Sequence, residues 1–114
     1  MSRLILLASG LLVFAGAPAS AQATNDVRCL LVSNFFAKVG TDAKAKRRAE
    51  AMSYFYLGRT VGRLNDAQLH AALNSEQRAL KRLKVGPVMA ACARVMDGSA
   101  NRLRNWSRQS ALAR

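Results

Sequence analysis

Residues 26–40 read DVRCLLVSNFFAKVG, and this stretch decides the fold. Its apolar side chains form two rows at helical spacing. The first row is Val27, Leu30, Leu31 and Phe35, and the second is Cys29, Val32, Phe36 and Val39. Two apolar rows on one segment predict a largely buried helix over 26–39, preceded by capping residues and ended by Gly40.

Two more helices are predicted further along the chain. Asp42 can cap a second helix, which we expect to continue to about Arg59. A third helix is predicted from Asn65 onward, because Asn and Asp stand directly before its apolar row. The pattern leaves open whether this third helix is interrupted at 74–75 or continues through Leu83.

A fourth helix is predicted after the break at 85–87, because Pro87 suits the first turn of a helix. The Asp97-Gly98 pair indicates a turn at its end. No segment of useful length alternates between apolar and polar residues, so no strand is expected. The sequence therefore predicts an all-α domain over 24–98, arranged as a small four-helix bundle.

The two cysteines of the chain, Cys29 and Cys92, fall on the first and the last of these helices. If the chain is exported, an even pair of cysteines predicts one disulfide, which would clamp the two helices together against the core. The chain-entropy model gives such a long loop a stabilisation of about 4 kcal/mol. Two free, buried thiols are the alternative.

The first 23 residues have the features of a secretory signal peptide. Arg3 precedes an apolar run over 4–17, and small residues after Pro18 offer cleavage sites after Ala21 or Ala23. The apolar run is shorter than the roughly 20 residues that a transmembrane helix needs. We therefore expect the mature chain to have no transmembrane span and to reside in the periplasm or outside the cell.

The C-terminal segment 99–114 contains four arginines and no acidic residue. Leu103 and Trp106 lie one helical turn apart, so a short amphipathic helix is possible. One interpretation is a basic tail that binds a membrane surface or a nucleic acid. The other is a loosely docked terminus with a single aromatic contact to the core.

The chain is strongly basic, with a formal charge of +12 that becomes +11 without Arg3, from 17 basic and 6 acidic residues. Two clusters are candidate anion-binding residues. They are Lys44, Lys46, Arg47 and Arg48, and Arg78, Lys81, Arg82 and Lys84. Such a domain attracts anionic envelope components such as lipopolysaccharide phosphates or anionic lipid, or an acidic protein. Export argues against nucleic acid as the partner. The alternative to an anion-binding surface is a basic surface that is only solvated.

Residues suited to catalysis are scarce. Asp26, Asp42 and Asp66 stand at predicted helix starts, where capping explains them. No two acids form a helix-spaced pair, and His70 alone cannot build a multi-histidine metal site. No glycine-rich phosphate loop occurs. The sequence predicts no enzyme, no metal site and no cofactor.

One short segment of the second helix concentrates aromatic residues, Tyr54-Phe55-Tyr56-Leu57. Core filling is the expected role for this segment, and a ligand groove is the alternative. Directly after it, Gly58 and Gly62 match a helix-contact spacing, although a helix end explains the pair better than an interface does.

Three segments resemble a group of short exported bacterial proteins with a single disulfide and no assigned function. They are 26–36, Phe55-Tyr56-Leu57-Gly58-Arg59, and Gly86-Pro87-x-Met89-x-x-Cys92-Ala93. In plan, a disulfide between the first and last core helices also resembles the HdeA acid-stress chaperones and, equally loosely, small periplasmic immunity proteins. Only Cys29 and Cys92 carry over to those families.

These observations together lead us to expect a non-enzymatic periplasmic binding protein with a basic surface for an anionic partner. A stress chaperone or an immunity-type inhibitor that works through apolar surface is the alternative. For an acid-triggered chaperone, the trigger would be weak, because the mature chain has only six carboxylates and one histidine to titrate.

Overall fold

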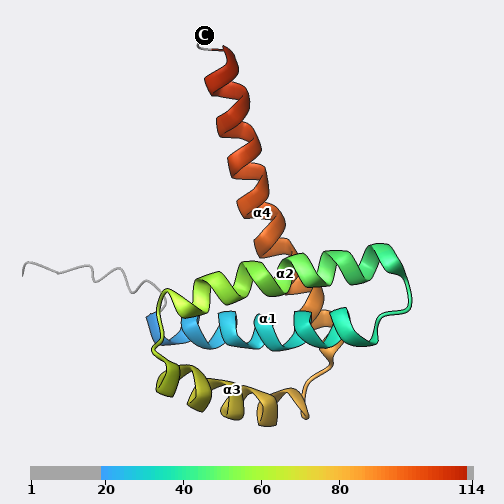
Figure 1. Ribbon diagram of the computed structural model, residues 1–114, viewed down its shortest axis with the longest axis vertical. Helices are drawn as coiled ribbons and strands as arrows, with labels where there is room; N and C mark the ends of the chain where they lie inside the picture. Colours follow the sequence, from blue (N-terminus) through green and yellow to red (C-terminus); the bar gives the residue numbers. More distant parts are fainter. Residues whose placement is uncertain (1–18, 113–114) are drawn as a thin grey trace, which may run out of the picture.

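The computed structural model describes residues 19–112 of the chain. It contains four helices, α1 (Ala19–Val39), α2 (Ala43–Val61), α3 (Asp66–Leu80) and α4 (Val85–Leu112), and these residues include no strand. The helices α1 and α2 form an antiparallel hairpin, α3 lies along the other side of α1, and α4 crosses the hairpin steeply (Figure 1). The predicted all-α, four-helix architecture is confirmed.

The helices begin where the sequence supplies caps. The Asp42 carboxylate accepts a hydrogen bond of 2.9 Å from the backbone N–H of Ala45. Asn65 forms a reciprocal capping box with Gln68, which satisfies two backbone donors at the start of α3. Pro87 lies in the first turn of α4, where its missing N–H has no helical partner to lose.

Several helix boundaries differ from those predicted. The helix α1 begins at Ala19, seven residues before the expected start at 26, while residues 1–18 of the expected signal peptide lie outside the described residues. The helix α3 passes through 74–75 without interruption and ends at Leu80. The prediction of a turn at Asp97-Gly98 was wrong, because α4 continues through it to Leu112.

The continuity of α4 is compatible with its local sequence. The Asp97 carboxylate accepts a hydrogen bond of 2.7 Å from Arg48 of α2, so its side chain is directed to the neighbouring helix. Gly98 costs a helix about 1 kcal/mol relative to alanine, which is too little to end a helix that continues well on both sides.

The core lies where α4 crosses α1 and α2. Its buried members are Met52 and Tyr56 of α2 and Cys92 of α4. Cys92 is joined by the predicted disulfide to Cys29 of α1, with a Cα–Cα separation of 5.6 Å. Partly buried Val88 and its neighbours on α4 pack against this cluster. The disulfide therefore clamps α1 to α4 against the core, as predicted.

Two buried carboxylates connect the helices near the core. Asp26, only 3% exposed, pairs with Arg59 at 3.0 Å and with Arg63 at 3.1 Å, which joins α1 to the end of α2. Glu76 of α3 pairs with Arg28 of α1 at 2.7 Å. Because α1 extends well before Asp26, the predicted capping role of this residue was wrong.

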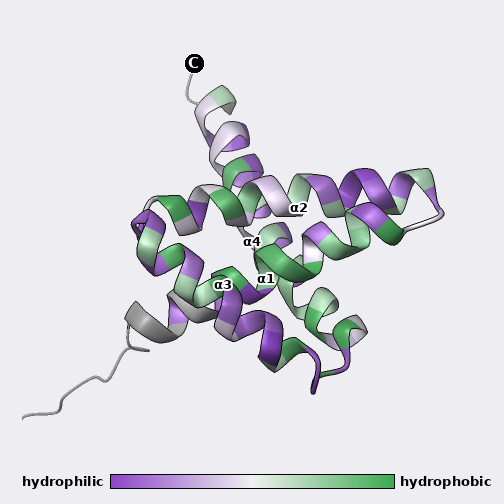
Figure 2. Ribbon diagram, turned by 60° about the horizontal axis from the view of Figure 1, so that its bottom comes forward, coloured by the Kyte–Doolittle hydropathy of each residue, from purple (hydrophilic) through white to green (hydrophobic). Residues whose placement is uncertain are grey.

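The second half of α4 projects away from the other helices (Figure 1). Leu103 and Trp106 are each 64% exposed, so of the two interpretations of this segment, the terminus docked to the core by an aromatic contact was wrong. Figure 2 shows hydrophilic and hydrophobic residues mixed along the projecting part. Across residues 19–112, no helix combines the length and the hydrophobicity that a membrane span requires.

Candidate functional site

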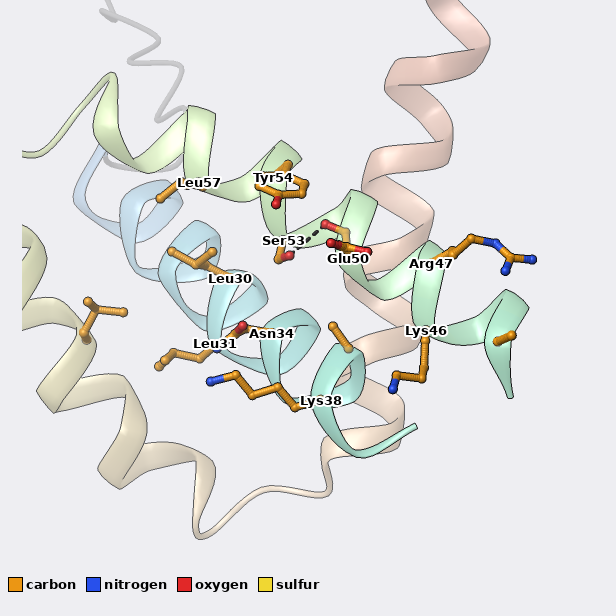
Figure 3. A pocket seen from close by; sticks show the side chains of 13 residues that line it. Leu30, Leu31, Asn34, Lys38, Lys46, Arg47, Glu50, Ser53, Tyr54 and Leu57 are labelled. Atoms are coloured by element: carbon orange, nitrogen blue, oxygen red, sulfur yellow. Dashed lines mark hydrogen bonds between the residues drawn. The ribbon is translucent and has the colours of Figure 1, made fainter. Parts of the chain in front are cut away.

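An open groove runs along the face of α1 that is turned away from the disulfide (Figure 3). At about 100° per helical residue, Leu31, Asn34 and Lys38 lie on the opposite side of α1 from Cys29. The helix α2 forms one wall, and Leu73 of α3 contributes to the other. The groove encloses about 860 Å³.

The two ends of the groove differ in chemistry. Leu30 and Leu57 line one end, and the backbones of Lys38, Lys46 and Arg47 lie at the other (Figure 3). The Lys38 side chain is directed toward Leu31, and the Arg47 side chain extends outward (Figure 3). Because α1 and α2 are antiparallel, residues 30 to 38 of α1 run alongside residues 57 to 46 of α2. The apolar residues of both helices therefore lie at the same end of the groove, and the basic residues of both lie toward the opposite end.

The turn between α1 and α2 makes room for one of these cations. A Cβ atom on Gly40 would lie 2.9 Å from Cγ of Lys46 and 2.8 Å from the carbonyl oxygen of Phe36. The methylene stem of Lys46 thus passes through the space that any other side chain at position 40 would occupy. Gly40 ends α1, as predicted, and also fixes the path of a groove cation.

A second hollow of about 370 Å³ adjoins the groove on the α3 side. It shares Leu31, Asn34 and Lys38 with the groove and is also lined by Phe35, which is 48% exposed. Lys81, which follows α3, adds a cation. Lys38 therefore lines both hollows and lies where they adjoin.

Three of the eight predicted anion-binding residues line these hollows. Lys46 and Arg47 line the groove, and Lys81 lines the second hollow. Lys44, Arg78, Arg82 and Lys84 are exposed and line neither hollow. Arg48 is directed to α4, where it pairs with Asp97 at 2.7 Å. The clusters read from the sequence are thus divided among different faces.

Lys38 is the groove cation that the sequence prediction missed. It follows Leu31 and Asn34 at spacings of seven and four residues, so the three share one face of α1. That row, apolar at one end and basic at the other, is the signal that could have identified it. The two predicted clusters are runs of charge, whereas Lys38 is not part of such a run.

The aromatic segment of α2 divides between the core and the groove. Tyr56 is buried, and Phe55 packs against the core cluster, which confirms core filling for these two. Tyr54 is 66% exposed and Leu57 is 40% exposed, and both line the groove, so core filling was wrong for them. Consecutive helical residues point about 100° apart, so a run of four cannot face one side.

One acid also lines the groove. Because Lys38, Lys46 and Arg47 outnumber the single carboxylate, Glu50, the side chains of the groove carry a net charge of +2. Within residues 19–112, no three histidine, cysteine, aspartate or glutamate side chains are placed to hold a metal ion. His70 is exposed on α3. The groove can therefore offer positive charge and apolar contact to a ligand.

No family model matches the chain, and no curated protein or solved structure is detectably similar to it.

Proposed function

We propose that the protein is an exported, non-enzymatic binding protein that holds an anionic partner in the groove along α1. The observation that carries the proposal is that cations from α1, α2 and the end of α3 line two adjoining hollows together with apolar side chains. Clustered cations beside low-dielectric side chains concentrate positive potential, which raises both the capture rate and the affinity for anions.

Export is part of the proposal. The N-terminal 23 residues have a signal peptide's composition. The Cys29–Cys92 disulfide also fits an oxidising compartment such as the periplasm or the extracellular space. Cleavage after Ala21 or Ala23 would leave Asp26 and its two arginine partners in the mature chain. The anionic partner is then an envelope component or another exported protein.

No chemical step is proposed. Glu50 is the one carboxylate that lines the groove, and it is exposed on α2. General acid–base work needs a second group held within hydrogen-bond reach of the same substrate atom. The proposed role is accordingly binding, with affinity set by charge and by burial of apolar surface.

The test is salt-dependent binding to lipopolysaccharide by two charge-reversed variants. Lys38→Glu/Lys46→Glu reverses groove cations, and Arg104→Glu/Arg108→Glu reverses exposed cations on the projecting part of α4. Both variants change the net charge equally. We expect added salt to weaken binding, the groove variant to lose at least about tenfold in affinity, and the control to lose much less. Salt-insensitive binding, or equal loss in both variants, contradicts the proposal.

A stress chaperone or an immunity-type inhibitor is the second candidate. The observation that favours it is the apolar face of α4 beyond the core, where Val95, Leu103 and Trp106 are 48%, 64% and 64% exposed. Such a surface suits contact with another protein. Suppression of protein aggregation at about pH 3 supports a chaperone, whereas capture of one stoichiometric partner from a periplasmic extract supports an inhibitor. Neither result is expected if binding is confined to the groove.

A further inference from the structure

The chemistry of the groove changes along its length, and this order restricts what can fill it. Leu30 and Leu57 stand at one end, and Lys38 with Lys46 at the other (Figure 3). A small inorganic anion would contact only the basic end and leave the apolar end exposed to water. A long polyanion would need cations along the whole length. A ligand that uses both ends has an anionic head and an apolar chain.

The size and the net charge of the groove narrow the class of ligand further. The groove encloses about 860 Å³, within the range of roughly 300–1,000 Å³ that is usual for small-molecule sites. Its lining comes mainly from the antiparallel helices α1 and α2, so a ligand chain can lie along the helix axes. The net charge of the lining is +2, because Glu50 offsets one of three cations. That balance suits a head group of low charge better than a polyphosphate.

The exposed apolar lining is also consistent with a ligand. Tyr54 is 66% exposed, Leu57 is 40% exposed, and Phe35 in the adjoining hollow is 48% exposed. These three side chains come from two helices and border one continuous surface, whose two hollows share Leu31 and Lys38. Covering this surface with a hydrocarbon chain would be favourable, because it removes apolar area from water.

We propose that the groove binds a single-chain anionic amphiphile, with its head group at Lys38 and Lys46 and its chain between Leu30 and Leu57. The class includes fatty acids and lysophospholipids, which share one anionic group at the end of one hydrocarbon chain. This inference rests on the proposed function, because it names the chemical class of the anionic partner.

The test is calorimetric titration with octanoate, decanoate and dodecanoate below their micelle concentrations, and with lysophosphatidylglycerol and dodecyl maltoside. We expect the affinity for the acids to rise about two- to fourfold per methylene group, because each buries a further part of the chain. The uncharged maltoside should bind at least about tenfold more weakly than dodecanoate. Tighter binding of dodecanoate indicates a free fatty acid, and tighter binding of lysophosphatidylglycerol indicates a phospholipid product; either supports the proposal.

Paired variants locate the site. Leu57→Ser should flatten the dependence on chain length, whereas Leu103→Ser, at an exposed apolar position on α4, should not. Lys38→Gln/Lys46→Gln should remove the preference for dodecanoate over maltoside, whereas Arg104→Gln/Arg108→Gln should retain it. Leu57 and the three control positions, Leu103, Arg104 and Arg108, are all exposed. Substitutions at these four positions should therefore leave the fold intact.

The outcomes separate the two proposals. Salt-sensitive binding to lipopolysaccharide without any dependence on chain length overturns the amphiphile inference and leaves the anion-binding function in place. Absence of binding to every anionic probe overturns both. Chain-length dependence that is unchanged by Leu57→Ser but lost in Leu103→Ser would place the amphiphile on α4, which also overturns the inference.

Discussion

The hydroxyl of Tyr56 donates a hydrogen bond of 2.7 Å to the carbonyl oxygen of Cys92, the residue whose sulfur is bonded to Cys29. Cys92 is thereby fixed to α2 through its backbone and to α1 through its side chain. This junction places α4 across one face of the α1–α2 hairpin. The opposite face of α1, which carries the groove, is left uncovered by α4.

Replacing Tyr56 by phenylalanine tests how much the hydrogen bond contributes to this junction. The ring still fills the core, so the loss should be that of one buried hydrogen bond, about 1 kcal/mol in the free energy of unfolding. For a domain of this size, that loss lowers the melting temperature by roughly 4–8 °C. Tyr54→Phe is the matched control, because Tyr54 is 66% exposed and its hydroxyl should contribute little. Equal melting temperatures for the two variants would show that the hydrogen bond of Tyr56 does not stabilise the junction.

Tyr56 also predicts how stability depends on alkaline pH. Burial raises the pKa of its phenol above the ordinary value, an effect that Arg59 opposes and Asp26 reinforces. With a folded-state pKa above that of the unfolded chain, the unfolded state loses this proton first. The contribution of Tyr56 is therefore fully present below about pH 10 and is lost as the pH rises through the folded-state pKa.

The measurement for that prediction is urea unfolding between pH 8 and pH 11. Lysines also titrate in this range, so the informative quantity is the difference in unfolding free energy between the native chain and Tyr56→Phe. We expect this difference to shrink as the pH rises above about 10. A difference that stays constant over the range would show that the phenol is not desolvated in the folded state.

The Asp26 ion pairs predict unequal effects of two similar substitutions. Asp26→Asn keeps the side-chain shape and removes the charge that Arg59 and Arg63 neutralise at 3.0 and 3.1 Å. Because the carboxylate is buried while both arginines are partly hydrated, we expect a loss of about 2 kcal/mol, below that of a fully buried pair. Asp97→Asn breaks the exposed pair with Arg48 and should cost about 0.5 kcal/mol or less. Urea unfolding of both variants measures the contrast, and comparable losses would refute it.

Two glycine substitutions should act in opposite directions. Gly40→Ala forces a Cβ to within 2.8 Å of the Phe36 carbonyl oxygen and 2.9 Å of the Lys46 stem, so we expect a loss of about 1–3 kcal/mol. The displaced Lys46 should also weaken anion binding. A Cβ on Gly58 would meet no side chain and no other helix within 4 Å, so Gly58→Ala should stabilise α2 by about 0.5–1 kcal/mol. Thermal unfolding checks both signs, and stabilisation by Gly40→Ala would show that the turn tolerates a side chain.

Local patterns account for the parts of the fold that the sequence predicted. The number of helices, the caps at Asp42 and Asn65, the position of Pro87 and the disulfide each follow from a few neighbouring residues or from the cysteine count. These features depend on backbone hydrogen bonding and side-chain chemistry within a turn or two. They are therefore visible before the packing of the helices is known.

The groove could not be predicted in the same way, because it depends on which face of α1 another helix covers. Leu31 and Cys29 are both apolar and look equivalent in the sequence, yet Cys29 packs against the core and Leu31 lines the groove. The steep crossing of α4 makes that difference, and a crossing angle is set by contacts between distant residues. For the same reason Lys38 was missed, whereas Lys46 and Arg47 were recognised as part of a run of charge.

The projecting part of α4 gives the last prediction. The face of α4 that carries Cys92 and Met96 packs against the core. Further along the helix, the same face carries Leu103 and Trp106, which are each 64% exposed. A chain that ends at Ser99 should therefore keep the disulfide-bonded core and unfold within about 0.5 kcal/mol of the full chain, because the deleted side chains support no other helix. Circular dichroism follows that unfolding, and acrylamide quenching of Trp106, the one tryptophan, should report an accessible indole in the full chain. A large loss of stability together with a shielded indole would mean that this segment packs against the bundle in solution.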